Sequence, residues 1–97
     1  MNSGGLKKFY ELCRGVKGEG EFKQLCSIFF THEELDSLGQ RVNLVEALLA
    51  GNMTQREMAK ELDVSIAKIT RGSNVLKRVD SQFKAELAAN LSKICVD

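Results

Sequence analysis

The stretch from Ser65 to Lys77, with the sequence SIAKITRGSNVLK, carries residues whose types and spacing suit ligand recognition. Its apolar residues predict a helix with one narrow buried stripe, formed by Ile66, Ile69 and Leu76. Short or cationic side chains on the other face suit a polar, negatively charged partner; they are Ala67, Lys68, Thr70, Arg71 and Asn74. Gly72 in mid-helix should cost about 1 kcal/mol relative to alanine, which indicates that something approaches its backbone closely.

Two short helices joined by a tight turn are predicted around this stretch, over residues 54–62 and 65–77. The first begins with a capping box, Thr54-Gln-Arg-Glu57, and Asp63 in the turn tolerates a positive φ. This layout is that of a helix-turn-helix, and the alternative is a plain helical hairpin inside a bundle. Six cations against three anions over residues 54–78, with few apolar residues on the outer face, favour the helix-turn-helix.

The rest of the chain also reads as helical. Apolar spacing predicts helices over roughly residues 4–16, 21–30, 31–50 and from 81 onward. Thr31-His-Glu-Glu34 is a second capping box, and Gly51 stands where a left-handed C-cap belongs. The segment 21–30 is apolar around much of its circumference, which predicts burial between subunits. We therefore expect an all-α chain of about six helices that forms one domain over residues 1–97.

Composition narrows the class of protein. The chain has 97 residues and no proline, and at this size a domain often needs a partner to bury enough apolar surface. Cys13, Cys26 and Cys95 show no metal-ligand spacing and are expected to be free thiols, while His32 alone is too little for a zinc site. No signal peptide or long apolar run is present, which predicts a soluble cytoplasmic protein. No nucleophile with a base and no paired carboxylates can be assembled, so we expect no enzyme.

The run from Phe30 to Lys77 resembles the tryptophan repressor family. The resemblance is carried by Leu38-Gly-Gln-Arg41, Val45-Glu46, Met53-Thr-Gln-Arg-Glu57 and above all Ile69-Thr-Arg-Gly-Ser-Asn74. It covers about half of the chain closely. The resemblance implies a homodimer with intertwined subunits that binds double-stranded operator DNA. L-tryptophan would be its co-repressor, and genes of tryptophan biosynthesis or uptake its targets.

The resemblance also implies a ligand site. Two arginines, Arg41 and Arg71, would hold the indole between them, and the second would pair with the ligand carboxylate. The Thr31 hydroxyl would help to hold that carboxylate, although a capping role alone also accounts for Thr31. The remaining matches are the backbone carbonyls of Ile28 and Phe30, which would receive the amino group, and Gly72, which would let the indole lie against the backbone. Taken singly, either arginine could instead be a solvated or phosphate-facing side chain.

The chain departs from the family pattern at three positions. Val75 lies where the familiar repressor has a serine that hydrogen-bonds the ligand amino group, a loss of about 1.5–3 kcal/mol if uncompensated. Lys68 replaces a threonine of the recognition helix and adds a cation near phosphates or base edges. His32 replaces a proline in the first turn of its helix, where no function is expected.

The residues expected to approach DNA lie at the start of the first short helix and along the second. They are Gln55, Arg56, Ile66, Ala67, Lys68, Thr70 and Asn74. Lys77 and Arg78 are expected to contact phosphates without sequence preference.

Two further hypotheses stay open. A DNA-binding dimer of the same fold could be constitutive or answer another small molecule, and Val75 motivates this alternative. A helical protein-interaction module, in which residues 54–77 dock a partner protein, belongs to a different class and would bind duplex DNA without salt dependence.

Overall fold

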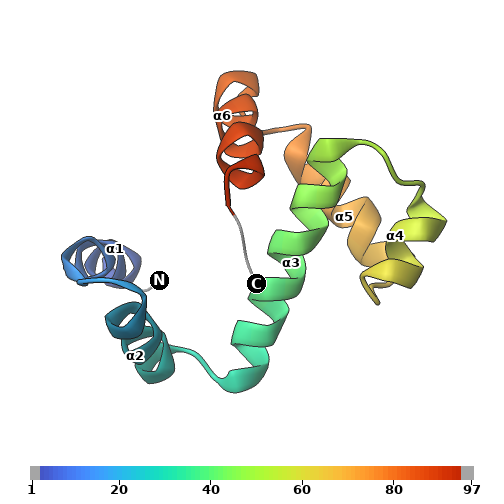
Figure 1. The fold of residues 1–97 in the computed structure, drawn as a ribbon. Coiled ribbons are helices and arrows are strands. Elements are labelled where there is room, and N and C mark those ends of the chain that lie inside the picture. Colours follow the sequence, from blue (N-terminus) through green and yellow to red (C-terminus); the bar gives the residue numbers. More distant parts are fainter. Residues whose placement is uncertain (1–2, 95–97) are drawn as a thin grey trace. The chain divides into compact units, whose positions relative to one another are not determined.

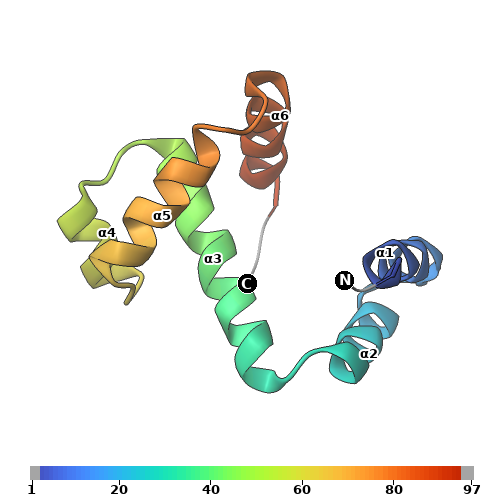
Figure 2. The same ribbon diagram turned by 180° about the vertical axis from the view of Figure 1, so that it is seen from behind.

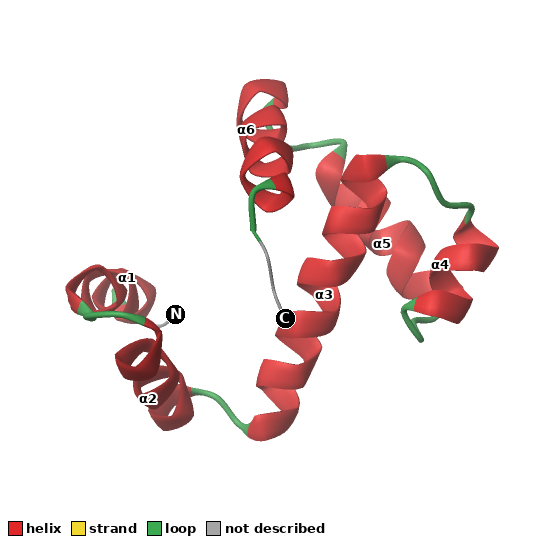
Figure 3. Cartoon of the chain, viewed as in Figure 1, coloured by secondary structure: helices red, strands yellow, loops and turns green. Residues whose placement is uncertain are grey.

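The computed structural model describes residues 3–94 and places most of them in α-helices (Figures 1 and 3). No strand occurs within this range. The prediction of an all-α fold with six helices is confirmed. The helices are α1 (Gly5–Gly15), α2 (Glu19–Phe29), α3 (His32–Ala50), α4 (Gln55–Glu61), α5 (Ile66–Leu76) and α6 (Ser81–Ser92).

The chain divides into two compact units, Met1–Asp36 and Ser37–Asp97, and α3 contributes to both. In the first unit the Phe9 ring of α1 meets Phe29 and Phe30 edge to face, at centroid distances of 5.8 and 5.6 Å. Cys26 is the one buried side chain among residues 3–36. Ile28 is 73% exposed and Phe29 is 53% exposed, so the apolar surface predicted for this helix is not covered within the Met1–Asp36 unit.

The second unit holds the larger core. Four buried side chains from α3, α4, the following turn and α5 pack together there: Leu44, Met58, Val64 and Ile69. Ile69 has no exposed surface, and α5 crosses α3 in both ribbon views (Figures 1 and 2). This small core seats the helix-turn-helix on α3.

Capping residues set the ends of these helices where the sequence predicts. Thr31 with Glu34 and Thr54 with Glu57 form reciprocal capping boxes, with hydrogen bonds of 2.8 and 3.1 Å in each. Ser65 accepts from the Lys68 N–H at the start of α5. The backbone N–H of Thr54, and then its hydroxyl, lower the pKa of Glu57 by stabilising the carboxylate.

Two left-handed positions predicted from the sequence are also found. Gly51, which ends α3, has φ 68°, and Asp63 in the turn between α4 and α5 has φ 54°. Asp63 is thus the residue that reverses the chain inside the helix-turn-helix. The Val64 N–H closes this turn by donating to the Ala59 carbonyl at 3.2 Å.

The structure differs from expectation at Ile66, while the start of the last helix and the free cysteines agree with it. Ile66, the first residue of α5, is 49% exposed and does not belong to the buried stripe of this helix. The last helix, α6, begins at Ser81 as predicted, and its N-cap Asp80 accepts from the Phe83 N–H. Cys13 and Cys26 are free thiols, and Cys95 lies outside the described residues. No helix within residues 3–94 is long and apolar enough to cross a membrane.

Truncating Ile69 should destabilise the fold far more than truncating Ile66 one turn earlier on the same helix. Ile69→Ala opens a cavity in the core and should lower the free energy of unfolding by about 2–5 kcal/mol. Ile66→Ala, the control, should change it by less than about 1 kcal/mol. Urea denaturation followed by circular dichroism measures both, and equal losses would contradict the described core.

Candidate functional site

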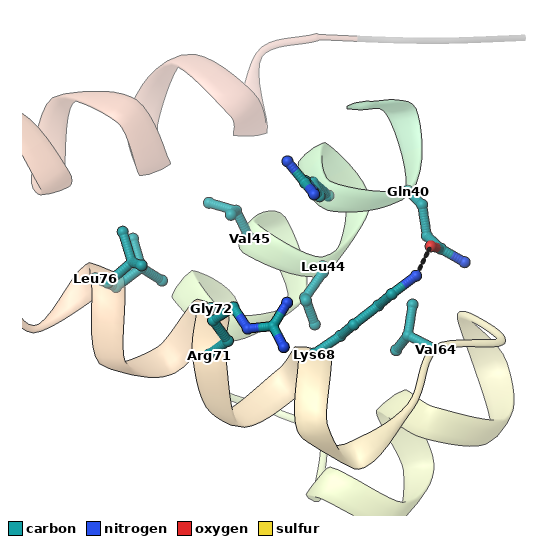
Figure 4. Close-up of a pocket in the computed structure, with 10 residues that line it drawn as sticks. Gln40, Leu44, Val45, Val64, Lys68, Arg71, Gly72 and Leu76 are labelled. Carbon is teal, nitrogen blue, oxygen red and sulfur yellow. Dashed lines mark hydrogen bonds between the residues drawn. The ribbon is translucent and has the colours of Figure 1, made fainter. Parts of the chain in front are cut away.

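A cavity of about 350 Å³ opens between α3 and α5 in the Ser37–Asp97 unit (Figure 4). One wall comes from α3, the other from α5, and Val64 of the preceding turn closes one side. Most of the lining is apolar. The lining residues are Gln40, Arg41, Leu44, Val45, Val64, Lys68, Arg71, Gly72, Val75 and Leu76.

Four of the seven predicted ligand residues line this one cavity: Arg41, Arg71, Gly72 and Val75. They come from sequence positions about thirty residues apart, and the crossing of α3 and α5 brings them together. In Figure 4 the Arg71 guanidinium lies beside Gly72 and Leu44, on the side of α5 that faces α3.

The other three predicted ligand residues belong to the Met1–Asp36 unit. Phe30 is the C-cap of α2, and its N–H donates to the Cys26 carbonyl at 2.9 Å. Ile28 is exposed near the end of the same helix. The Thr31 hydroxyl accepts from the Glu34 N–H at 3.1 Å and therefore acts as a cap. Their roles toward a ligand stay predictions.

Gly72 shows what approaches the backbone of α5. A Cβ at this position would lie 3.3 Å from Leu44 Cδ2 and 3.3 Å from Leu48 Cδ1. The close approach that the glycine predicts is therefore made by α3 itself. Gly72 also lines the cavity, so a ligand there would meet a wall with no side chain at that point.

Gln40 links the two sides of the cavity by hydrogen bonds. Its amide Nε2 donates to the Asp63 carbonyl at 3.0 Å, and its Oε1 accepts from Lys68 Nζ at 3.3 Å, the bond drawn in Figure 4. Sequence reasoning missed Gln40 as a lining residue and assigned Lys68 to DNA. Helical spacing could have predicted Gln40 as a lining residue, because positions 40, 41, 44 and 45 lie on one face of α3.

The electrostatics of the cavity are one-sided. Its charged lining residues are Arg41, Lys68 and Arg71, and its lining contains no carboxylate. Within residues 3–94, none of the three forms a salt bridge. An apolar cavity bordered by three cations suits a flat apolar ligand that carries a negative charge.

The residues predicted to approach DNA are all exposed. Gln55 and Arg56 form the first turn of α4, and the other five lie along α5: Ile66, Ala67, Lys68, Thr70 and Asn74. The tight turn at Asp63 joins the two helices, as in a helix-turn-helix. The exposed outer side of α5 carries short side chains, which permit close approach of another molecule.

Comparison with known proteins identifies relatives of this chain. The family model described as "Trp repressor protein" matches residues 4–91. A "Trp operon repressor homolog" of Chlamydia caviae is 45% identical over 92 residues, covering 95% of this chain and 90% of the relative. Proteins of the same description from Chlamydia trachomatis serovar D and Pasteurella multocida are 44% and 34% identical, covering 82% and 88% of this chain and 85% and 83% of the relatives.

Replacing the mid-helix glycines by alanine should separate packing from helix propensity. At Gly39 of α3 a Cβ meets nothing within 4 Å, so Gly39→Ala should raise the free energy of unfolding by about 0.5–1 kcal/mol. At Gly72 the crowded leucine methyl groups should cancel that gain or reverse it by about 1–2 kcal/mol. Urea denaturation measures both, and an equal gain at Gly72 would show that α5 does not need this close approach.

Proposed function

The chain belongs to the Trp repressor protein family, whose members are DNA-binding regulators and not enzymes, and we propose that it is an L-tryptophan-dependent transcriptional repressor. In this proposal it acts in the cytoplasm as a homodimer that binds operator DNA through the helix-turn-helix of α4 and α5. The regulated genes would be those of tryptophan biosynthesis or uptake. The observation that supports the proposal most is the joint position of Arg41, Arg71 and Gly72 in one cavity.

The cavity suits tryptophan in size and chemistry. Leu44, Val45 and Leu76 offer apolar walls to the indole, and the guanidinium groups of Arg41 and Arg71 can stack on its faces. Either guanidinium can also donate two parallel hydrogen bonds to a carboxylate. The family resemblance also assigns ligand contacts to the carbonyls of Ile28 and Phe30 and to the Thr31 hydroxyl, and these stay predictions separate from the cavity.

Ligand control of DNA binding follows from the position of α5. The helix lines the cavity with Arg71 and Gly72 and exposes Ala67 and Thr70 to the surroundings. A ligand between α3 and α5 favours the arrangement of α5 that it fits best. If that arrangement is also the one that fits DNA, ligand and DNA strengthen each other's binding by the same factor. Tryptophan is then a co-repressor.

The homodimer is supported by the apolar surface that the chain leaves uncovered. Only five side chains within residues 3–94 are buried apolar residues, while large apolar side chains are exposed on five of the six helices. Exposed apolar surface of this extent is typical of a subunit interface. The most exposed are Leu6, Tyr10, Ile28, Phe29, Val75, Phe83 and Ile94.

A second candidate keeps the fold and changes the ligand. Val75 lines the cavity and is 53% exposed, and its side chain has no group that can hydrogen-bond an amino group. This observation favours a dimer that answers another aromatic anion. A thermal-shift screen in which another metabolite stabilises the protein more than tryptophan does would support this candidate.

Removing the guanidinium at position 71 should weaken tryptophan binding. The chain has no tryptophan of its own, so the fluorescence of the ligand reports its binding directly. Arg71→Met should raise the Kd by roughly ten- to hundredfold, because a charge-assisted hydrogen bond contributes about 1.5–3 kcal/mol. Arg14→Met on α1, where Arg14 pairs with Glu11 on the surface, is the control and should leave the Kd unchanged.

Sequence-specific DNA binding by the protein should also depend on tryptophan. Rounds of selection from a random duplex library, with and without saturating tryptophan, should enrich a two-fold symmetric site only when tryptophan is present. The enriched duplex should then bind the tryptophan-loaded protein more tightly than the free protein. Equal affinity with and without saturating tryptophan would rule out ligand gating, while a loss of tryptophan gating together with salt-independent DNA binding would favour a protein-interaction module.

A further inference from the structure

We infer that Lys68 is a residue of the ligand site, where its ammonium group contacts the carboxylate of the ligand, and that it is not a DNA contact. This inference rests on the proposed function of the cavity and reassigns a residue that the sequence had placed on the DNA-facing side of α5. With Lys68, the site contains three cationic side chains and is selective for indole compounds that carry a carboxylate.

Helical spacing separates Lys68 from the DNA-facing residues. Residues three, four, seven and eight positions after Lys68 share its face of α5, and all four of them line the cavity: Arg71, Gly72, Val75 and Leu76. The remaining predicted DNA contacts on α5 follow the same spacing on a different face. Thr70 and Asn74 lie three and seven positions after Ala67 and four and eight positions after Ile66, and none of these four residues lines the cavity.

The contacts of Lys68 agree with this assignment. Its side chain extends from α5 toward α3 in Figure 4, and its Nζ donates to Gln40 Oε1 at 3.3 Å. Gln40 is itself held by its bond to the Asp63 carbonyl at 3.0 Å. Gln40 is therefore a positioning residue, which keeps the ammonium at the cavity although Lys68 is an exposed residue.

The ammonium group has hydrogen-bonding capacity left for a ligand. It has three donors, and Gln40, a neutral amide, uses one of them. A ligand carboxylate can accept from the other two without displacing Gln40. The same charge repels an amine, and the oxygen of the one lining amide, Gln40, is already engaged. Lys68 therefore favours carboxylates and disfavours amines that lack one.

The test compares two ligands that differ in the carboxylate. Tryptophan has the carboxylate and tryptamine lacks it, and both fluoresce in a chain that has no tryptophan. Lys68→Met keeps an unbranched side chain, one atom shorter than that of lysine, and removes its charge. It should raise the Kd for tryptophan by roughly three- to tenfold and leave the Kd for tryptamine unchanged or lower. Lys60→Met on α4, outside the cavity, should change neither.

Salt dependence of DNA binding provides a second, independent readout. With tryptophan saturating, the slope of log affinity against log salt on a mixed-sequence duplex should be the same for Lys68→Met as for the unmodified protein. If Lys68 instead neutralised a phosphate, its replacement would lower the magnitude of that slope by about 0.9. A lower slope with unchanged tryptophan affinity would assign Lys68 to DNA and overturn the inference.

The outcomes separate the inference from the function on which it rests. If the unmodified protein binds tryptophan and Lys68→Met binds both ligands as the unmodified protein does, the inference fails and the proposed function stands. An equal loss for tryptophan and tryptamine also overturns it, because the lysine then acts on packing. If the unmodified protein does not bind tryptophan, both fail.

Discussion

The close approach of α5 to α3 at Gly72 is the constraint on which this site depends. A Cβ added at that position would lie only 3.3 Å from side-chain carbons of Leu44 and Leu48. Leu44 belongs both to the buried core and to the lining of the cavity. Leu44 therefore joins the wall of the cavity to the core that holds the helix-turn-helix on α3.

Local features of the fold could be read from the sequence because they depend on neighbours a few residues away. The capping boxes at Thr31 and Thr54, the cap at Ser65 and the left-handed backbone at Asp63 all occur where their residue types indicate. Each is a hydrogen bond or a dihedral preference within one turn of helix. Longer-range packing does not enter, so spacing alone suffices.

Features that depend on how the helices cross were harder to predict from the sequence. Ile66 fits the apolar spacing of α5 and yet is half exposed, whereas Ile69, three residues later, is buried with Leu44 of α3 and Met58 of α4. Gln40 and Lys68 are 28 residues apart in the sequence and form a hydrogen bond. Neither residue type predicts this pairing by itself. The glycine at position 72 predicts a close approach to the backbone of α5. The leucines that make this approach belong to α3, and the angle at which α3 crosses α5 cannot be predicted from the residues next to Gly72.

The separation of α5 into two faces also affects how the properties of this helix can change during evolution. One set of positions (68, 71, 72, 75 and 76) borders the cavity, and another (66, 67, 70 and 74) does not. Under the proposed function, substitutions in the first set would alter ligand selectivity, and those in the second would alter the choice of DNA site. The two properties would then change separately within three turns of a single helix.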